Sequence, residues 1–264
     1  MADLPEIISV GLLAYASKDL IKAVLGPTAE FLGQETRGLV EKCNINLSNV
    51  FKVAYRKLSG KEESKGRVNL RVFKEVVSEG KFSDDPICQE YYGGILAASK
   101  TSDGSDDRGV YYLSVIRDLS SVQLRLHYLA YLKVAYHFHS YKEDRLETLF
   151  ERQKVKIHIQ FNTLSLVFKE QDADRLYNFC VHAMVGLREK QLIAEKGVYV
   201  DGVYTPRFSN IEGRGLVVTP TLLGCELFLW GNGISNVPGS HIGRADLTLV
   251  QKIYNTGDIV ITTS

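Results

Sequence analysis

The sequence predicts a mainly α-helical protein with a smaller α+β part towards the C-terminus: a helical N-terminal region followed by a winged-helix-like module. Residues 7–25 and 27–58 place apolar side chains three or four positions apart, which is the helical period. Residues 155–161 alternate apolar and polar side chains, as a half-buried strand does. Residues 172–232 are expected to form a helix, a β-hairpin and a second helix, which is the order of a winged helix.

Three regions follow from these patterns. We expect an N-terminal helical pair over residues 1–58, a helical middle region over 67–153, and a winged-helix-like α+β module with a C-terminal extension over 154–264. The stretch 59–66, S-G-K-E-E-S-K-G, has no apolar residue and is typical of a solvated linker.

The composition is that of an ordinary soluble globular protein, with 45% hydrophobic and 24% charged residues in a chain of 264. Lys and Arg number 32 against 31 Asp and Glu. Dedicated nucleic-acid binders usually carry a basic excess, so this balance argues against one, although a local basic patch remains open.

Cysteine usage and the N-terminus indicate the cytoplasm. The first residues, M-A-D-L-P-E, are acidic where a signal peptide is basic, and the apolar run 7–16 is far shorter than the ~20 residues that span a bilayer. The four cysteines lie far apart without metal-ligand spacing, so free thiols are expected. They are Cys43, Cys88, Cys180 and Cys225.

The first predicted helix, residues 7–25, is amphipathic and ends at a Gly-Pro pair. Its apolar stripe could contact a partner or a membrane surface, but its polar face has few cations, so packing on another helix is favoured. The stripe includes Ile8, Leu12, Leu20 and Leu25. A second helix is expected over 27–58, because its apolar positions form a seam suited to pairing with a helix.

The middle region is predicted to be helical from residue 86 onwards. Residues 70–77 are too short for periodicity to decide between helix and strand. Ser83-Asp84-Asp85-Pro86 is a strong helix start, and Gly93-Gly94 inside that helix predicts close packing of a neighbour. Helices are also expected over 110–119, 121–136 and 141–153.

Two features of the middle region were tested as metal sites. The loop 101–109 has three Asp but lacks the ligand order of an EF-hand, so an exposed turn is favoured over Ca²⁺ binding. His137 and His139 diverge by about 200° on a continuing helix, and His127 faces another way, so an aromatic helix end is favoured over a metal site.

The C-terminal module is predicted element by element. After a bend near Asn162-Thr163, the alternation of 155–161 is expected to continue through Leu164, Leu166 and Phe168. Asp172 or Asp174 caps the next helix, residues 192–218 form a hairpin, and Thr219-Pro220 starts a helix that ends at Gly231. A short helix over 245–254 and a late strand over 259–261 that pairs with 155–161 complete the module.

A winged helix bound to DNA would need cations on its recognition helix and wing. Three cations spread along the helix are also ordinary surface chemistry. The candidate DNA-binding residues are Arg175, Arg188, Lys190, Lys196, Arg207 and Arg214.

Enzyme motifs do not fit the sequence. In G-S-H-I-G, residues 239–243, the serine is second rather than central, so the nucleophile elbow is not matched. Gly231-Asn232-Gly233 lacks the third glycine of a dinucleotide fingerprint. A nuclease centre of scattered acids remains open, since metal ligands need not be close in sequence. We expect no catalytic residues, no metal and no cofactor.

Several segments together resemble one family, the abortive-infection alpha family of bacteria and phage-related elements. They are L-I-K-A-V-L-G-P-T-A-E-F-L-G at 20–33, D-D-P-I-C-Q-E-Y-Y-G-G-I-L-A-A-S-K at 84–100, L-S-S-V-Q-L at 119–124 and V-T-P-T-L-L-G at 218–224. The resemblance covers roughly residues 20–230. K-Q-L-I at 190–193 replaces the family's G-L-I, and the following connection is longer, so a shared wing surface is in doubt.

The resemblance implies a role in defence against phage and carries no catalytic residues with it. We therefore expect a cytoplasmic, non-enzymatic interaction protein that acts through protein contacts, with a protein partner or self-association. A winged-helix DNA-binding regulator is the alternative, and a membrane-associating toxin or effector is the second alternative.

Overall fold

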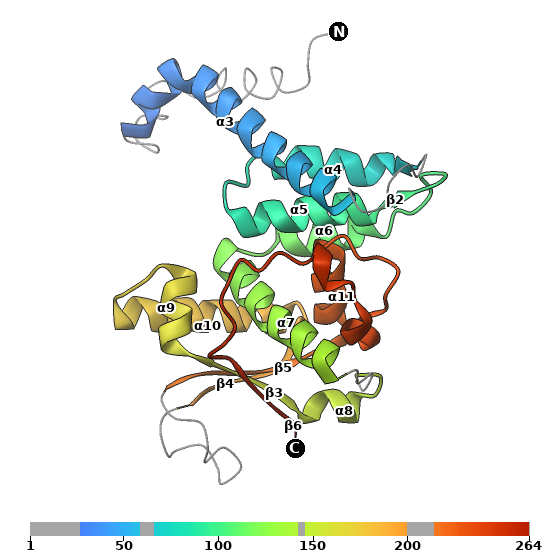
Figure 1. The fold of residues 1–264 in the computed structure, drawn as a ribbon. Coiled ribbons are helices and arrows are strands. Elements are labelled where there is room, and N and C mark those ends of the chain that lie inside the picture. The colour runs from blue at the N-terminus through green and yellow to red at the C-terminus, as the bar shows by residue number, and fades with distance from the viewer. Residues whose placement is uncertain (1–26, 59–65, 142–145, 200–213, 264) are drawn as a thin grey trace. The chain divides into compact units, whose positions relative to one another are not determined.

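A computed structural model describes residues 27–58, 66–141, 146–199 and 214–263 (Figure 1). The chain divides into two compact units, residues 1–45 and residues 46–264. The described part is mainly helical, with a small antiparallel sheet in the C-terminal part. Both coarse features were predicted.

Helix α3, Pro27–Leu58, has the predicted bounds and crosses the boundary between the two units. Within the second unit, its seam residues Val50 and Ala54 are buried, as the spacing of three and four predicted. The expected helix over 7–25 lies outside the described residues. None of the described helices combines the length and the apolar character needed to cross a membrane.

Four helices of the middle region follow: α4 (Leu70–Gly80), α5 (Pro86–Ala98), α6 (Gly109–Arg117) and α7 (Ser121–Tyr141). The ambiguous stretch 70–77 is therefore helical. Asp85 caps α5 by accepting a hydrogen bond from the backbone N–H of Ile87, with Pro86 in the first turn, as predicted. Two-residue strands β1 (Arg67–Val68) and β2 (Lys100–Thr101) pair beside α4 and α5.

The two glycines of α5 allow neighbouring helices to approach closely. A Cβ on Gly93 would lie 2.6 Å from Val53 of α3, and a Cβ on Gly94 would lie 1.8 Å from the carbonyl oxygen of Gly231. Gly231 ends α11 (Leu222–Gly231). Close packing was the predicted reason for this glycine pair, and it is confirmed.

The C-terminal sheet has the strand order β4-β5-β3-β6 and is antiparallel throughout. Its strands are β3 (Val155–Gln160), β4 (Ile193–Tyr199), β5 (Gly215–Pro220) and β6 (Val260–Thr263). Ile157 pairs with Val218 on one side and Ile261 on the other, so the late strand does pair with β3. In Figure 1, helices α7 and α10 lie on one side of this sheet.

Helix α10, Ala173–Glu189, is capped by Asp172 and buries the predicted face. The buried residues are Leu176, Cys180, Ala183, Met184 and Leu187. The order α10, β4, β5, α11 is thus the expected helix, hairpin and helix. The hairpin belongs to a four-stranded sheet, in which β3 is the second partner of β5.

Three local predictions were wrong. Residues 161–168 form helix α9 (Phe161–Phe168) rather than a continued strand, because Leu164, Val167 and Phe168 are buried at helical spacing. Pro220 ends β5, and Thr221 caps α11 instead of Thr219. Residues 245–254 contain only a short 3-10 turn, η3 (Leu247–Leu249), which follows η2 (Gly239–Arg244).

The expected helix over 141–153 is partly outside the described residues. Its described part includes α8, Leu149–Lys154, which begins with a capping box between Thr148 and Glu151.

The segment after α11 returns over the helical core, where Ile242, Val250 and Ile259 are buried, and polar side chains of the core bind its backbone. The Tyr128 hydroxyl donates to the carbonyl oxygen of Gln251 at 2.7 Å, and Lys133 Nζ donates to that of Thr256 at 3.2 Å. Strand β6 then adds to β3. Side chains of α7 therefore fix the path of this segment.

Candidate functional site

A buried ion pair joins α3 to α5. Lys57 is 1% exposed and Glu90 2%, and Lys57 Nζ lies 2.5 Å from Glu90 Oε1. The same ammonium donates to Asn232 Oδ1 at 3.3 Å and to the Leu249 carbonyl at 3.1 Å. Burial lowers the pKa of Lys57, against the opposing effect of Glu90. An ammonium has three N–H donors, and these three acceptors use all of them. The ion pair therefore has a structural role in joining the elements around it.

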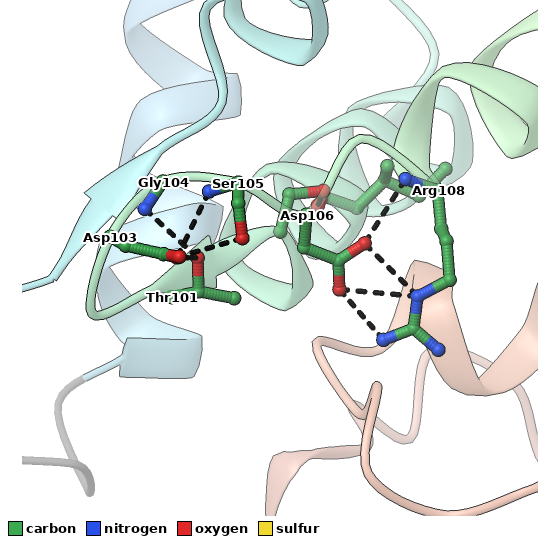
Figure 2. A network of polar contacts seen from close by, with 8 residues as sticks. Thr101, Asp103, Gly104, Ser105, Asp106 and Arg108 are labelled. Carbon is green, nitrogen blue, oxygen red and sulfur yellow. Dashed lines mark hydrogen bonds and ion pairs between the residues drawn. The ribbon is translucent and has the colours of Figure 1, made fainter.

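The exposed loop between β2 and α6 is fixed by its own side chains (Figure 2). Asp103 Oδ1 accepts hydrogen bonds from the Ser105 N–H at 3.0 Å, the Ser105 hydroxyl at 2.9 Å and the Thr101 hydroxyl at 3.1 Å. These bonds lower the pKa of Asp103. Because this carboxylate is occupied by local donors, the loop is an exposed and ordered turn, as predicted.

At the end of the loop, Asp106 orients the side chain of Arg108. Asp106 accepts from Arg108 Nε at 3.0 Å and from a terminal nitrogen of the guanidinium at 2.7 Å, which is a two-point contact (Figure 2). These hydrogen bonds lower the pKa of Asp106 and raise that of Arg108. The guanidinium lies 5.1 Å from the ring centroid of Trp230 on α11. Its side chain is nevertheless 64% exposed.

Two tyrosines of α6 extend this arrangement. The Tyr112 ring stacks on Trp230 with centroids 4.8 Å apart, and its hydroxyl donates to Glu226 Oε2 at 3.1 Å. The exposed ring of Tyr111 stands edge-on to Tyr112 at 5.5 Å. We call the set formed by Arg108, Tyr111, Tyr112 and Trp230 the Arg108 surface.

The Arg108 surface combines exposed groups with a buried aromatic support. It presents a cation and an aromatic ring to solvent, and both rest on buried aromatic rings that hold them in place. Sequence reasoning missed it, because α11 lies more than a hundred residues after α6. The available signal was the single tryptophan together with the Y-Y pair after an Asp-rich turn.

The candidate DNA-binding cations on α10 are partly neutralised by acids. Arg175 Nε lies 3.0 Å from Glu170, and Lys190 Nζ lies 2.6 Å from Asp118 at the end of α6. Arg188 is exposed in the last turn of α10. The structure does not gather the three into a continuous basic patch.

The wing cations are described only in part. Arg214 is exposed and lines a hollow of about 470 Å³ together with Asp174 and Tyr177. Lys196 lies in β4, and its side chain is outside the described part. Arg207 is also outside it, as are the candidate contact residues of the N-terminal stripe: Ile8, Leu12, Leu20 and Leu25.

The histidines of α7 have separate surroundings. His127 is fully buried, and its Nδ1 is hydrogen-bonded to the Tyr91 hydroxyl. Burial lowers the pKa of His127 to about 3, so the ring is neutral at physiological pH. His139 Nδ1 lies 3.1 Å from the carbonyl oxygen of Gly243. Across the four described stretches, no three His, Cys, Asp or Glu side chains could hold a metal ion together.

A row of serine, histidine and glutamate side chains lies near η2, and the sequence did not predict it. The Ser240 hydroxyl lies 2.9 Å from His241 Nδ1, and His241 Nε2 lies 3.2 Å from Glu147. A hydroxyl, an imidazole and a carboxylate in a row can activate a serine. Here Glu147 is 61% exposed, so water screens its charge from the imidazole. We interpret the row as a surface hydrogen-bond chain.

Comparisons with protein-family models, with curated proteins and with solved structures found no match to this chain.

Proposed function

We propose that this chain is a cytoplasmic, non-enzymatic interaction protein of bacterial defence against phage, and that it acts through protein contacts at the Arg108 surface. The segments that resemble the abortive-infection alpha family support the defence setting. Protein contacts are supported by the residue types, because Arg, Tyr and Trp dominate binding energy at protein interfaces.

The proposal rests on one observation: contacts within the chain already hold the side chains of this surface in place before a partner binds. Asp106 holds the guanidinium of Arg108 from one side, while Trp230 lies under it. Tyr111 is placed by Tyr112, whose hydroxyl is fixed by Glu226. A partner that binds here loses little side-chain entropy, and such entropy losses otherwise reduce affinity.

Plating of phage on a host that expresses the protein tests the proposal. The double variant Arg108→Ala/Tyr111→Ala removes two exposed side chains, and we expect it to lose protection while retaining the helical circular dichroism of the parent. Tyr177→Ala is the matched control, because Tyr177 is an exposed tyrosine on α10. The proposal fails if the double variant protects as well as the parent, or if the parent changes neither plaque formation nor growth.

A winged-helix DNA-binding regulator is the second candidate, favoured by the order α10, β4, β5, α11 and by the exposed Arg188. We propose this set of elements as the winged-helix-like module. Binding of duplex DNA should weaken steeply with salt, because counterions are released. Absence of a gel shift at low salt, or an unchanged shift after Arg188→Glu, would exclude this candidate.

A further inference from the structure

A second exposed surface lies on α3 and α4 and shares no residue with the Arg108 surface. The two helices run antiparallel, since Asn46 Nδ2 donates to the Lys81 carbonyl while Phe51 stacks on Phe73 with ring centroids 6.2 Å apart. Tyr55 and Leu70 are 75% and 82% exposed. We call Phe51, Tyr55, Leu70 and Phe73 the α3–α4 surface.

These four side chains share one face on each helix. At 100° per residue, Tyr55 lies roughly 40° round α3 from Phe51, and Leu70 lies roughly 60° round α4 from Phe73. The buried residues lie in the other direction round each helix: Ala54 and Val50 roughly 60° and 100° from Phe51, and Val76 and Val72 roughly 60° and 100° from Phe73. Both helices are therefore held side by side with their apolar residues pointing outwards.

The charges beside this surface are cationic. Exposed lysines, Lys52 and Lys74, directly follow the two phenylalanines. Residues 46–58 contain no Asp or Glu. The acids of α4, Glu75 and Glu79, lie roughly 200° and 240° round the helix from Phe73. Apolar side chains flanked by lysines, with carboxylates on the far side, match an anionic partner.

We infer that the α3–α4 surface binds an anionic lipid bilayer. An amphipathic helix with aromatic and leucine side chains on one face and lysines beside them lies in the membrane interface. Two such faces on neighbouring helices can enter one bilayer surface together. Lys52 and Lys74 would meet anionic headgroups, and their aliphatic stems extend past the apolar side chains.

A lipid surface fits these residues better than a protein partner does. The cation of the Arg108 surface is oriented by a carboxylate of the same chain. On the α3–α4 surface the charges that follow Phe51 and Phe73 are lysines, while Arg71 beside Leu70 pairs with Asp107. The most exposed groups are apolar side chains that a bilayer can accept without a shaped pocket. The inference uses none of the residues on which the proposed defence contacts rest.

Co-sedimentation of the full-length protein with vesicles tests the inference. We expect binding to phosphatidylcholine vesicles to rise when phosphatidylglycerol is included, and to fall with salt. Tyr55→Ser/Leu70→Ser should weaken partitioning at least about tenfold, because two large apolar side chains no longer enter the interface. Lys52→Gln/Lys74→Gln should weaken it about fivefold per lysine, and only when phosphatidylglycerol is present.

Leu149→Ser/Phe150→Ser is the matched control, since it removes an apolar pair of α8 whose side chains are also exposed, by 61% and 68%. Its binding should equal that of the parent. Three results would overturn the inference: no vesicle binding by the parent, equal loss in the α8 control, or undiminished binding by Tyr55→Ser/Leu70→Ser. Loss of phage protection in that variant without vesicle binding by the parent would also overturn it and would assign the surface to a protein.

Discussion

Replacing Gly94 by Ala tests the close backbone approach between α5 and α11. The new Cβ would lie 1.8 Å from the carbonyl oxygen of Gly231. This is about 1.5 Å short of the roughly 3.3 Å at which a carbon and an oxygen meet. The obstructing atoms belong to the backbone, so α11 must shift. Overpacking of this kind costs about 3 kcal/mol, and the better helix propensity of Ala offsets about 1 kcal/mol.

We therefore expect Gly94→Ala to lower the free energy of unfolding by about 2 kcal/mol, which corresponds to a loss of about 4–8 °C in Tm. Urea unfolding followed by circular dichroism measures it. Gly80→Ala in α4 is the control, because its Cβ would meet Val50 only at 3.5 Å. We expect that control to change stability by less than about 0.5 kcal/mol. Equal stability of the two variants would refute the packing argument.

Four further predictions concern individual side chains. His127 has a pKa of about 3 in the folded protein against an ordinary 6.5, so below pH 6.5 the unfolded chain binds a proton that the folded chain does not. The free energy of unfolding should therefore fall by about 1.4 kcal/mol per pH unit between pH 6.5 and about pH 3. Urea titrations at several pH values measure this dependence, and His127→Gln should abolish the part due to His127. Lys57→Met leaves Glu90 buried beside one remaining cation, Arg56, and should lower the free energy of unfolding by about 3 kcal/mol. The double variant Lys57→Met/Glu90→Leu should restore part of this loss. Denaturant melts that show no recovery would contradict the pairing. Asp106→Ala frees Arg108 and should weaken phage protection without lowering Tm by more than about 2 °C. Ser240→Ala should leave protection intact and a fluorophosphonate probe should not label Ser240, whereas labelling would contradict a non-enzymatic role.

The sequence predicted the elements whose signals are local. The spacing along α3, the alternation along β3 and the caps at Asp85 and Asp172 each lie within a few residues of one another. A local signal also explains why a strand was predicted where α9 forms. The run 164–168 satisfies both an alternating and a helical spacing, and only packing against the core selects the helix.

The candidate site depended on contacts that a sequence does not contain. Arg108 and Trp230 come together only because α11 crosses α5 through two glycines. Lysine is ordinarily a surface residue, and the burial of Lys57 follows from acceptors on α5, directly after α11 and at the end of η3. The glycine pair Gly93-Gly94 was the one local hint of this crossing.

The manner in which the segment after α11 is held has a consequence for sequence variation. Lys57, Tyr128 and Lys133 donate to main-chain carbonyl oxygens at Leu249, Gln251 and Thr256. Every residue type supplies such an oxygen, so substitutions at these three positions keep the hydrogen bonds as long as the backbone path is kept. Related chains should therefore tolerate drift at these three positions. An insertion or deletion that shifts the frame would instead remove one acceptor from each of two buried donors, leaving Lys57 with Glu90 and Asn232 and leaving Tyr128 with Asn232.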